Sequence, residues 1–99
     1  MKASSSKMLN LGCGKDIKKG YLNLDYIKHS GVDLVHDLNK TPYPFNDDEF
    51  DVIQAIHILE HLESPKKVVE EMHRITKHNG KVIITVPHAS QLLERFGQI

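Results

Sequence analysis

The chain has 99 residues, of which 39% are hydrophobic and 26% are charged, and its formal net charge at pH 7 is zero. This length predicts one soluble domain, and the zero net charge excludes a global electrostatic attraction for nucleic acid or anionic membranes. No hydrophobic run approaches the roughly 20 residues of a membrane span. Cys13 is the single cysteine, so an internal disulfide is excluded and a reducing, cytoplasmic location is expected.

The first segment of the chain, MKASSSK, carries lysines but no hydrophobic stretch after them. It therefore lacks the pattern of a signal peptide. We expect residues 1–7 to be a short disordered lead and residues 8–99 to form one domain.

Five short runs have the composition of β-strands and are bounded by glycine, proline or acidic residues. In chain order they are residues 7–13, 21–26, 32–38, 50–59 and 81–87. The last run is rich in β-branched residues, which indicates a central strand buried on both faces.

One helix is predicted over residues 65–78. Ser64 suits the N-cap and Pro65 the first helical position, where a missing N–H costs nothing. The spacing of four apolar residues gives the helix one buried stripe, formed by Val68, Val69, Met72 and Ile75. Gly80 suits the left-handed position that ends a helix.

The order strand, helix, strand over residues 50–87 predicts a parallel pair with a right-handed crossover. The earlier connections are shorter than the dozen or so residues that a parallel crossover usually needs. We expect a parallel sheet in which these first crossovers are irregular loops. Antiparallel pairing of some early strands stays open as the alternative.

The sequence Gly12-Cys13-Gly14 directly follows the first predicted strand. Glycines there allow positive φ angles and let a ligand approach the backbone closely, although plain tight turns also contain this pattern. Asp25 and Asp37 end the second and third predicted strands, where a carboxylate can accept hydrogen bonds from ribose hydroxyls. Each acid alone is also an ordinary turn residue. Together with the glycine turn, they predict a nucleoside site.

The turn does not have the pattern that binds a pyrophosphate. Ile17 stands where the dinucleotide fingerprint has its third glycine, and no GK[ST] sequence is present. A dinucleotide-binding protein of the NAD type therefore stays only as an alternative. The pattern favours a nucleoside that lacks a pyrophosphate.

Four segments carry a family resemblance: LNLGCGKD, LNLDY, HDLNKTPYPFNDDEFDVIQAIHILEHL and VVEEMHRITKHNGKVIITVPH. In this order and spacing they resemble class I S-adenosylmethionine-dependent methyltransferases of the type 11 kind. The resemblance implies a Rossmann-like three-layer α/β sandwich with about five mostly parallel strands in the order 3-2-1-4-5. The chain would be a short or truncated member that lacks the last two strands of the family.

The resemblance implies S-adenosylmethionine as cofactor and methyl transfer to an unknown small-molecule or macromolecular acceptor. The cofactor contacts that it implies are Gly12, Cys13 and Gly14 around the methionine part, Asp25 at the ribose, Asp37 and Leu38 at the adenine, and Ala55, Ile56 and His57 beside the reactive methyl.

The sequence HILEH, with His57, Glu60 and His61, matches the H-x-x-E-H pattern of one class of zinc peptidases. A second alternative is metal-assisted methyl transfer, with His88 as a further ligand. We expect no metal and interpret His57 first, and His61 second, as the general base that removes a proton from the acceptor.

A non-catalytic reading stays beside the enzymatic one. A chain that keeps the cofactor fold but has lost its substrate half would serve as an S-adenosylmethionine-binding or partner-docking module. The sheet edge left exposed in a short member would then suit a dimer contact or a partner subunit. Neither a membrane nor a nucleic acid is indicated as partner.

Overall fold

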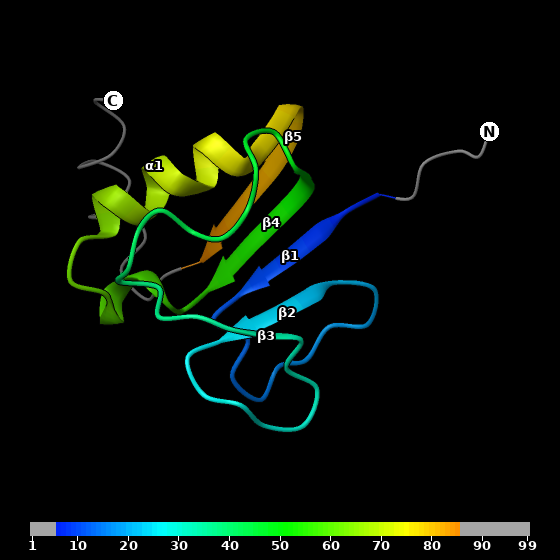
Figure 1. Ribbon diagram of the computed structural model, residues 1–99, viewed down its shortest axis with the longest axis vertical. Coiled ribbons are helices and arrows are strands. Elements are labelled where there is room, and N and C mark those ends of the chain that lie inside the picture. The colour runs from blue at the N-terminus through cyan, green and yellow to red at the C-terminus, as the bar shows by residue number, and fades with distance from the viewer. Residues whose placement is uncertain (1–5, 86–99) are drawn as a thin grey trace.

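The computed structural model of the chain describes residues 6–85, and its centre is a sheet of five strands (Figure 1). The strands are β1 (Met8–Leu11), β2 (Leu22–Asp25), β3 (Leu34–Val35), β4 (Phe50–Ile56) and β5 (Thr76–Thr85). Between β4 and β5 lie the 3-10 helix η1 (Leu59–His61) and the helix α1 (Pro65–Ile75).

The sheet order is β3-β2-β1-β4-β5, and every neighbouring pair is parallel. The predicted α/β topology is therefore confirmed. The connections from β1 to β2 and from β2 to β3 join parallel strands although they contain no helix. In register, Leu9 of β1 lies beside Leu22 of β2 and Ile53 of β4. All strands thus end at one edge of the sheet, where ligands of such folds bind.

The hydrophobic core lies between α1 and one face of the sheet. Alternating strand residues supply the sheet side of the core, and the apolar stripe of α1 supplies the other side. The fully or almost fully buried members include Leu9, Leu11, Leu24, Ile53, Ala55, Val68, Met72 and Ile75. Figure 1 shows α1 lying across β4 and β5.

The opposite face of the sheet carries a row of buried amide side chains across β4, β1 and β2. Gln54 Nε2 lies 3.5 Å from Asn10 Oδ1, and Asn10 Nδ2 donates to Asn23 Oδ1 at 2.9 Å. The row also holds the connection between β1 and β2, because Asn10 donates to the Asp16 carbonyl and Asn23 accepts from the Lys18 N–H, both at 2.9 Å. The connection between β1 and β2 is thus a loop held by hydrogen bonds to the Asn10 and Asn23 side chains, where other α/β proteins have a crossover helix.

The helix begins as predicted and ends earlier than predicted. The Ser64 side chain accepts a hydrogen bond from the Lys67 N–H, and Pro65 is the first helical residue. The predicted end at residue 78 is wrong, because Thr76 is already extended and pairs with Phe50 of β4. The left-handed residue is Asn79, with φ of 70°, and not Gly80.

A polar network ties the long loop before β4 to α1. Glu71 is buried on α1 and accepts from the Tyr43 N–H at 2.7 Å and from Arg74 Nε at 2.8 Å. Arg74 also donates to the Phe45 carbonyl at 3.0 Å. These bonds lower the pKa of the Glu71 carboxyl, chiefly through the Arg74 guanidinium.

The prediction that the last strand is buried on both faces is wrong for the described residues. β5 lies at the edge of the sheet, and Val82, Ile83 and Ile84 are 39%, 39% and 37% exposed. Hydrophobic composition alone does not distinguish a central strand from an apolar edge strand. Residues 86–99 lie outside the described part, and so does the predicted ligand His88.

Two further expectations concern the lead at residues 1–7 and membrane spans. Residues 1–5 of the expected lead lie outside the described residues. Lys7, also part of that lead, forms an ion pair in which its ammonium lies 2.7 Å from the Glu49 carboxylate. In the part of the chain that the structure describes, no helix has the length and apolar character needed to cross a membrane.

Candidate functional site

The glycine turn lies directly beyond the carboxyl end of β1. Gly12 and Gly14 have φ angles of 64° and 51°, a left-handed conformation that favours glycine. A β-carbon on Gly12 would lie 2.6 Å from side-chain atoms of Ile58, so any larger residue here would force the Ile58 side chain to move. A β-carbon on Gly14 would meet no atom of residues 6–85 within 4 Å. The backbone at Gly14 is therefore open to a ligand.

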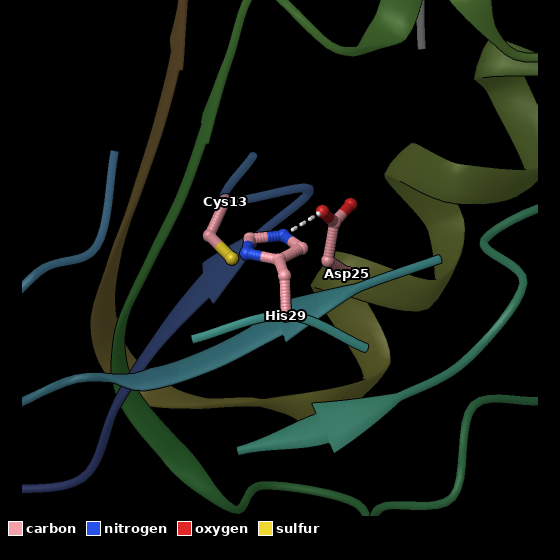
Figure 2. Close-up of side chains that lie close together, drawn as sticks. All are labelled: Cys13, Asp25 and His29. Carbon is pink, nitrogen blue, oxygen red and sulfur yellow. Dashed lines mark hydrogen bonds and ion pairs between the residues drawn. The ribbon is translucent and has the colours of Figure 1, made fainter. Parts of the chain in front are cut away.

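Asp25 lies beside this turn, at the carboxyl end of β2, together with Cys13 and His29 (Figure 2). His29 Nε2 lies 2.7 Å from Asp25 Oδ2, and Asp25 Oδ1 accepts from the Tyr26 N–H at 2.9 Å. The Asp25 side chain is 21% exposed and the His29 side chain 35%. The structure thus brings the predicted turn and the predicted carboxylate together, with a histidine between them.

Burial and charge keep Cys13 in its thiol form. The residue is 4% exposed, and its N–H donates to the Leu24 carbonyl at 3.0 Å. Burial raises the pKa of the Cys13 thiol, and the nearby carboxylate of Asp25 raises it further. A buried thiol with a raised pKa is a poor nucleophile.

His29 is the residue at this site that is not among the positions predicted from the sequence. Its place follows from packing between two loops. A β-carbon on Gly31 would lie 2.7 Å from Ile17, so the loop after β2 lies directly against the glycine-turn loop. The available signal was Gly31 itself, whose φ of 93° allows the chain to turn back.

Asp37 and Leu38 follow β3 at the same edge of the sheet. Asp37 Oδ1 accepts from the Asn39 N–H at 3.0 Å, which is the hydrogen bond of an Asx turn. Leu38 is 4% exposed and belongs to the core, and its carbonyl accepts from the Tyr43 hydroxyl at 2.9 Å. Asp37 therefore offers a partly exposed carboxylate, and the hydrogen bond from Tyr43 holds the backbone next to it at Leu38.

The last predicted positions lie at the carboxyl end of β4. Ala55 is fully buried in the core, whereas Ile56 is partly exposed and His57 is exposed. His57 has a φ of 53°, which is uncommon for a residue with a side chain, and its N–H donates to the Thr85 carbonyl at 2.6 Å. Strained residues of this kind gather at functional sites.

The H-x-x-E-H pattern does not form a ligand cluster in the described residues. His61 lies on η1 with its side chain 71% exposed, and its Nε2 is 3.6 Å from Glu60 Oε2. Among residues 6–85, the one group of three or more potential metal ligands is Cys13, Asp25 and His29. The geometry therefore gives no support to a zinc peptidase site on β4 and η1.

A parallel sheet in this order, with a glycine turn and an acidic residue at its carboxyl edge, defines a Rossmann-like α/β protein. Residues 9–84 match the sequence model of the methyltransferase domain family. The chain belongs to this family, and the resemblance stated from the sequence is confirmed.

Two curated relatives show how much of a longer protein the chain represents. An uncharacterized protein of Methanocaldococcus jannaschii is 33% identical over 81 residues, which are 82% of this chain and 38% of that protein. The demethylmenaquinone methyltransferase of Renibacterium salmoninarum is 30% identical over 69 residues, which are 70% of this chain and 29% of that enzyme. The chain therefore spans well under half the length of these relatives.

Two solved structures share the fold. One is a chain of the complex between the Haloferax volcanii Trm112 methyltransferase activator and a methyltransferase, with a TM-score of 0.65 and 21% identity. The other is the YcgJ protein from Bacillus subtilis, with a TM-score of 0.64 and 19% identity. The matches cover 92% and 81% of this chain, and 52% and 43% of those chains.

Proposed function

We propose that this chain binds S-adenosylmethionine at the carboxyl edge of its sheet and serves in methyl transfer to an acceptor that is still unknown. The observation that carries the proposal is the pairing of the open glycine turn after β1 with the Asp25 carboxylate after β2. Membership of the methyltransferase domain family supports it.

The residues present fit a nucleoside with an amino-acid tail. The open backbone at Gly14 leaves room for close approach, and the partly exposed carboxylate of Asp25 can accept two ribose hydroxyls. Asp37 is available for the adenine side of the site, beyond β3. The buried free thiol of Cys13 is compatible with the reducing cytoplasm, where we place the protein.

The bound cofactor would supply an electrophilic methyl group on a sulfonium, so the main task of the protein is to position the acceptor. We assign His57 as the first candidate for the base that accepts the acceptor's proton, because it is exposed directly after β4 and its backbone is held in a strained conformation. His61 on η1 is the second candidate.

The test is calorimetric titration of the purified chain with S-adenosylmethionine and S-adenosylhomocysteine. We expect micromolar binding that is lost in Asp25→Ala. The matched control is Asp48→Asn, because Asp48 is an exposed acid just before β4 and the substitution keeps a residue that tolerates its φ of 55°. A folded chain that binds neither compound, or an Asp25→Ala variant that binds as well as the wild type, contradicts the proposal.

A non-catalytic docking module is the second candidate function, and the apolar edge of β5 favours it. Val82, Ile83 and Ile84 are each more than a third exposed in the described structure. A dimer or a partner subunit that adds to this edge would cover them. Light scattering across a concentration series tests the dimer, since a strictly monomeric chain at high concentration excludes it.

A further inference from the structure

We propose that Cys13, Asp25 and His29 form a binding site for a thiophilic divalent cation of the Zn²⁺ type. The three side chains come from three segments: the glycine turn, the end of β2 and the loop after β2 (Figure 2). Their donor atoms all lie within 4.8 Å of one another. This geometry is set by the contact between the two loops at Gly31 and Ile17.

The donor set is one that zinc prefers, because sulfur, imidazole nitrogen and carboxylate oxygen are its usual protein ligands. With metal–ligand bonds of roughly 2.0–2.3 Å, the ligand atoms of a tetrahedral ion lie about 3.2–3.8 Å apart. A donor pair at the 4.8 Å limit must therefore close by about 1.0–1.6 Å, while His29 Nε2 and Asp25 Oδ2 must separate from their 2.7 Å hydrogen bond by about 0.5–1.1 Å.

The charges around Cys13 favour a cation, which would displace the thiol proton and bind the thiolate. The carboxylates of Asp25, Asp33 and Asp16 all place negative potential on Cys13. The His29 side chain is 35% exposed, which gives an ion a path from solvent to the site. Three protein ligands leave one position for water, as in zinc sites that stay open.

The site also has a consequence that rests on the proposed function. The Asp25 carboxylate is the group proposed to hold the ribose, and an ion bound to it occupies one of the two oxygen atoms that the ribose hydroxyls would use. Metal and nucleoside would therefore exclude each other. A thiophilic cation would keep the chain in a form that does not bind the cofactor.

The first experiment measures Zn²⁺ affinity on the full chain after treatment with a chelator, by competition with a zinc-binding dye. We expect one ion per chain, and an affinity at least about tenfold lower in Cys13→Ser and in His29→Gln. His36→Gln and His73→Gln are the matched controls, because both histidines lie outside the cluster, and they should bind zinc like the wild type. Circular dichroism establishes that each variant is folded.

Cobalt binding provides a second measurement, which reports directly on a bond between the Cys13 sulfur and the metal and not on a general change in the fold. Co²⁺ bound to a thiolate shows a sulfur-to-metal charge-transfer absorption, which we expect in the wild type and not in Cys13→Ser. Equal zinc affinity in Cys13→Ser, His29→Gln and the wild type would show that surface histidines hold the ion. That result, or cobalt binding without the absorption, overturns the proposal.

The competition is tested separately, as the ratio of S-adenosylhomocysteine dissociation constants with and without saturating Zn²⁺. We expect a ratio above about ten in the wild type and near one in His29→Gln. If the chain binds zinc through Cys13 but does not bind S-adenosylhomocysteine, the metal-site proposal stands and the proposed function is contradicted. A wild-type ratio of one, with both ligands bound, overturns the shared use of Asp25.

Discussion

Asn10 in β1 donates a 2.9 Å hydrogen bond from its side-chain amide to the side-chain oxygen of Asn23 in β2, and both residues are almost fully buried. The pair lies on the face of the sheet opposite α1. Because the same two amides hold the backbone at Asp16 and Lys18, they fix the loop that carries the glycine turn. The candidate site therefore depends on a polar network beneath it.

Replacement of Asn23 by alanine should destabilise the chain strongly. The change leaves the Asn10 amide and the Lys18 N–H without their buried acceptor, which costs roughly 3 kcal/mol for such a pair of groups. Urea unfolding measures this loss. Asn46→Ala is the control, because Asn46 is exposed, and it should change stability by no more than about 0.5 kcal/mol. Equal stabilities of the two variants would contradict a structural role for the amide row.

The two glycines of the turn should respond differently to alanine. Gly12→Ala places a methyl group 2.6 Å from Ile58 in addition to the backbone strain, so we expect a loss of about 3 kcal/mol in stability. Gly14→Ala adds only the strain of its positive φ, about 1 kcal/mol, since no atom of the described part of the chain lies within 4 Å of the new methyl.

The same pair separates packing from ligand binding. Gly14→Ala should remain folded yet bind S-adenosylhomocysteine more weakly, because the methyl group enters the open space above the turn. Thermal unfolding and calorimetric titration on one sample of each variant provide the comparison. Unchanged ligand affinity in Gly14→Ala would mean that the ligand does not approach this backbone.

Glu71→Gln should remove a pH-dependent part of the stability. The native pKa of Glu71 is lowered from its ordinary value of 4.5, so its contribution is present above about pH 4.5 and is lost as the pH falls below it. The variant should be less stable than the wild type by about 1–2 kcal/mol at pH 7, because Arg74 loses one of its two carboxylate partners and keeps Asp47. Urea unfolding between pH 7 and pH 3 should show this difference shrink. A difference that stays constant with pH excludes the carboxylate charge as its source.

His57→Ala should lower turnover and leave cofactor affinity almost unchanged, once an acceptor is found. A base of this kind contributes about 10²–10⁴-fold to the rate. Turnover at saturating S-adenosylmethionine and the dissociation constant of S-adenosylhomocysteine are the two measurements. A large loss of affinity would instead assign His57 to the cofactor contacts.

The apolar runs and the glycine and proline residues between them predicted the strands, whereas the sheet order came from the family resemblance, and the structure confirms it. The sequence was not sufficient for the end of α1. The chain from Thr76 onward could continue the helix by local preference, but pairing with Phe50 draws it into β5. Because Phe50 and Thr76 are distant in sequence, a local sequence pattern cannot predict their pairing.

The candidate site was predicted in part for the same reason. The glycine turn and Asp25 were predicted to lie together because both stand at the carboxyl ends of neighbouring strands, where the sheet topology alone brings them together. His29 was not found, because it reaches Asp25 only through the contact of Gly31 with Ile17. Contacts between loops depend on side-chain shape at one point and leave no periodic pattern.

The helix-free link between β1 and β2 also bears on how the chain folds. The amides that join these two strands are 13 residues apart in sequence, whereas those that join β1 to β4 are 44 apart. Closing the short loop costs less chain entropy, so we expect β1 and β2 to associate before β4 joins them. Mutational analysis of folding rates tests this order, with Leu24→Ala slowing folding and Ala55→Gly mainly accelerating unfolding. In this chain the segment that would receive the cofactor would then also be the folding nucleus.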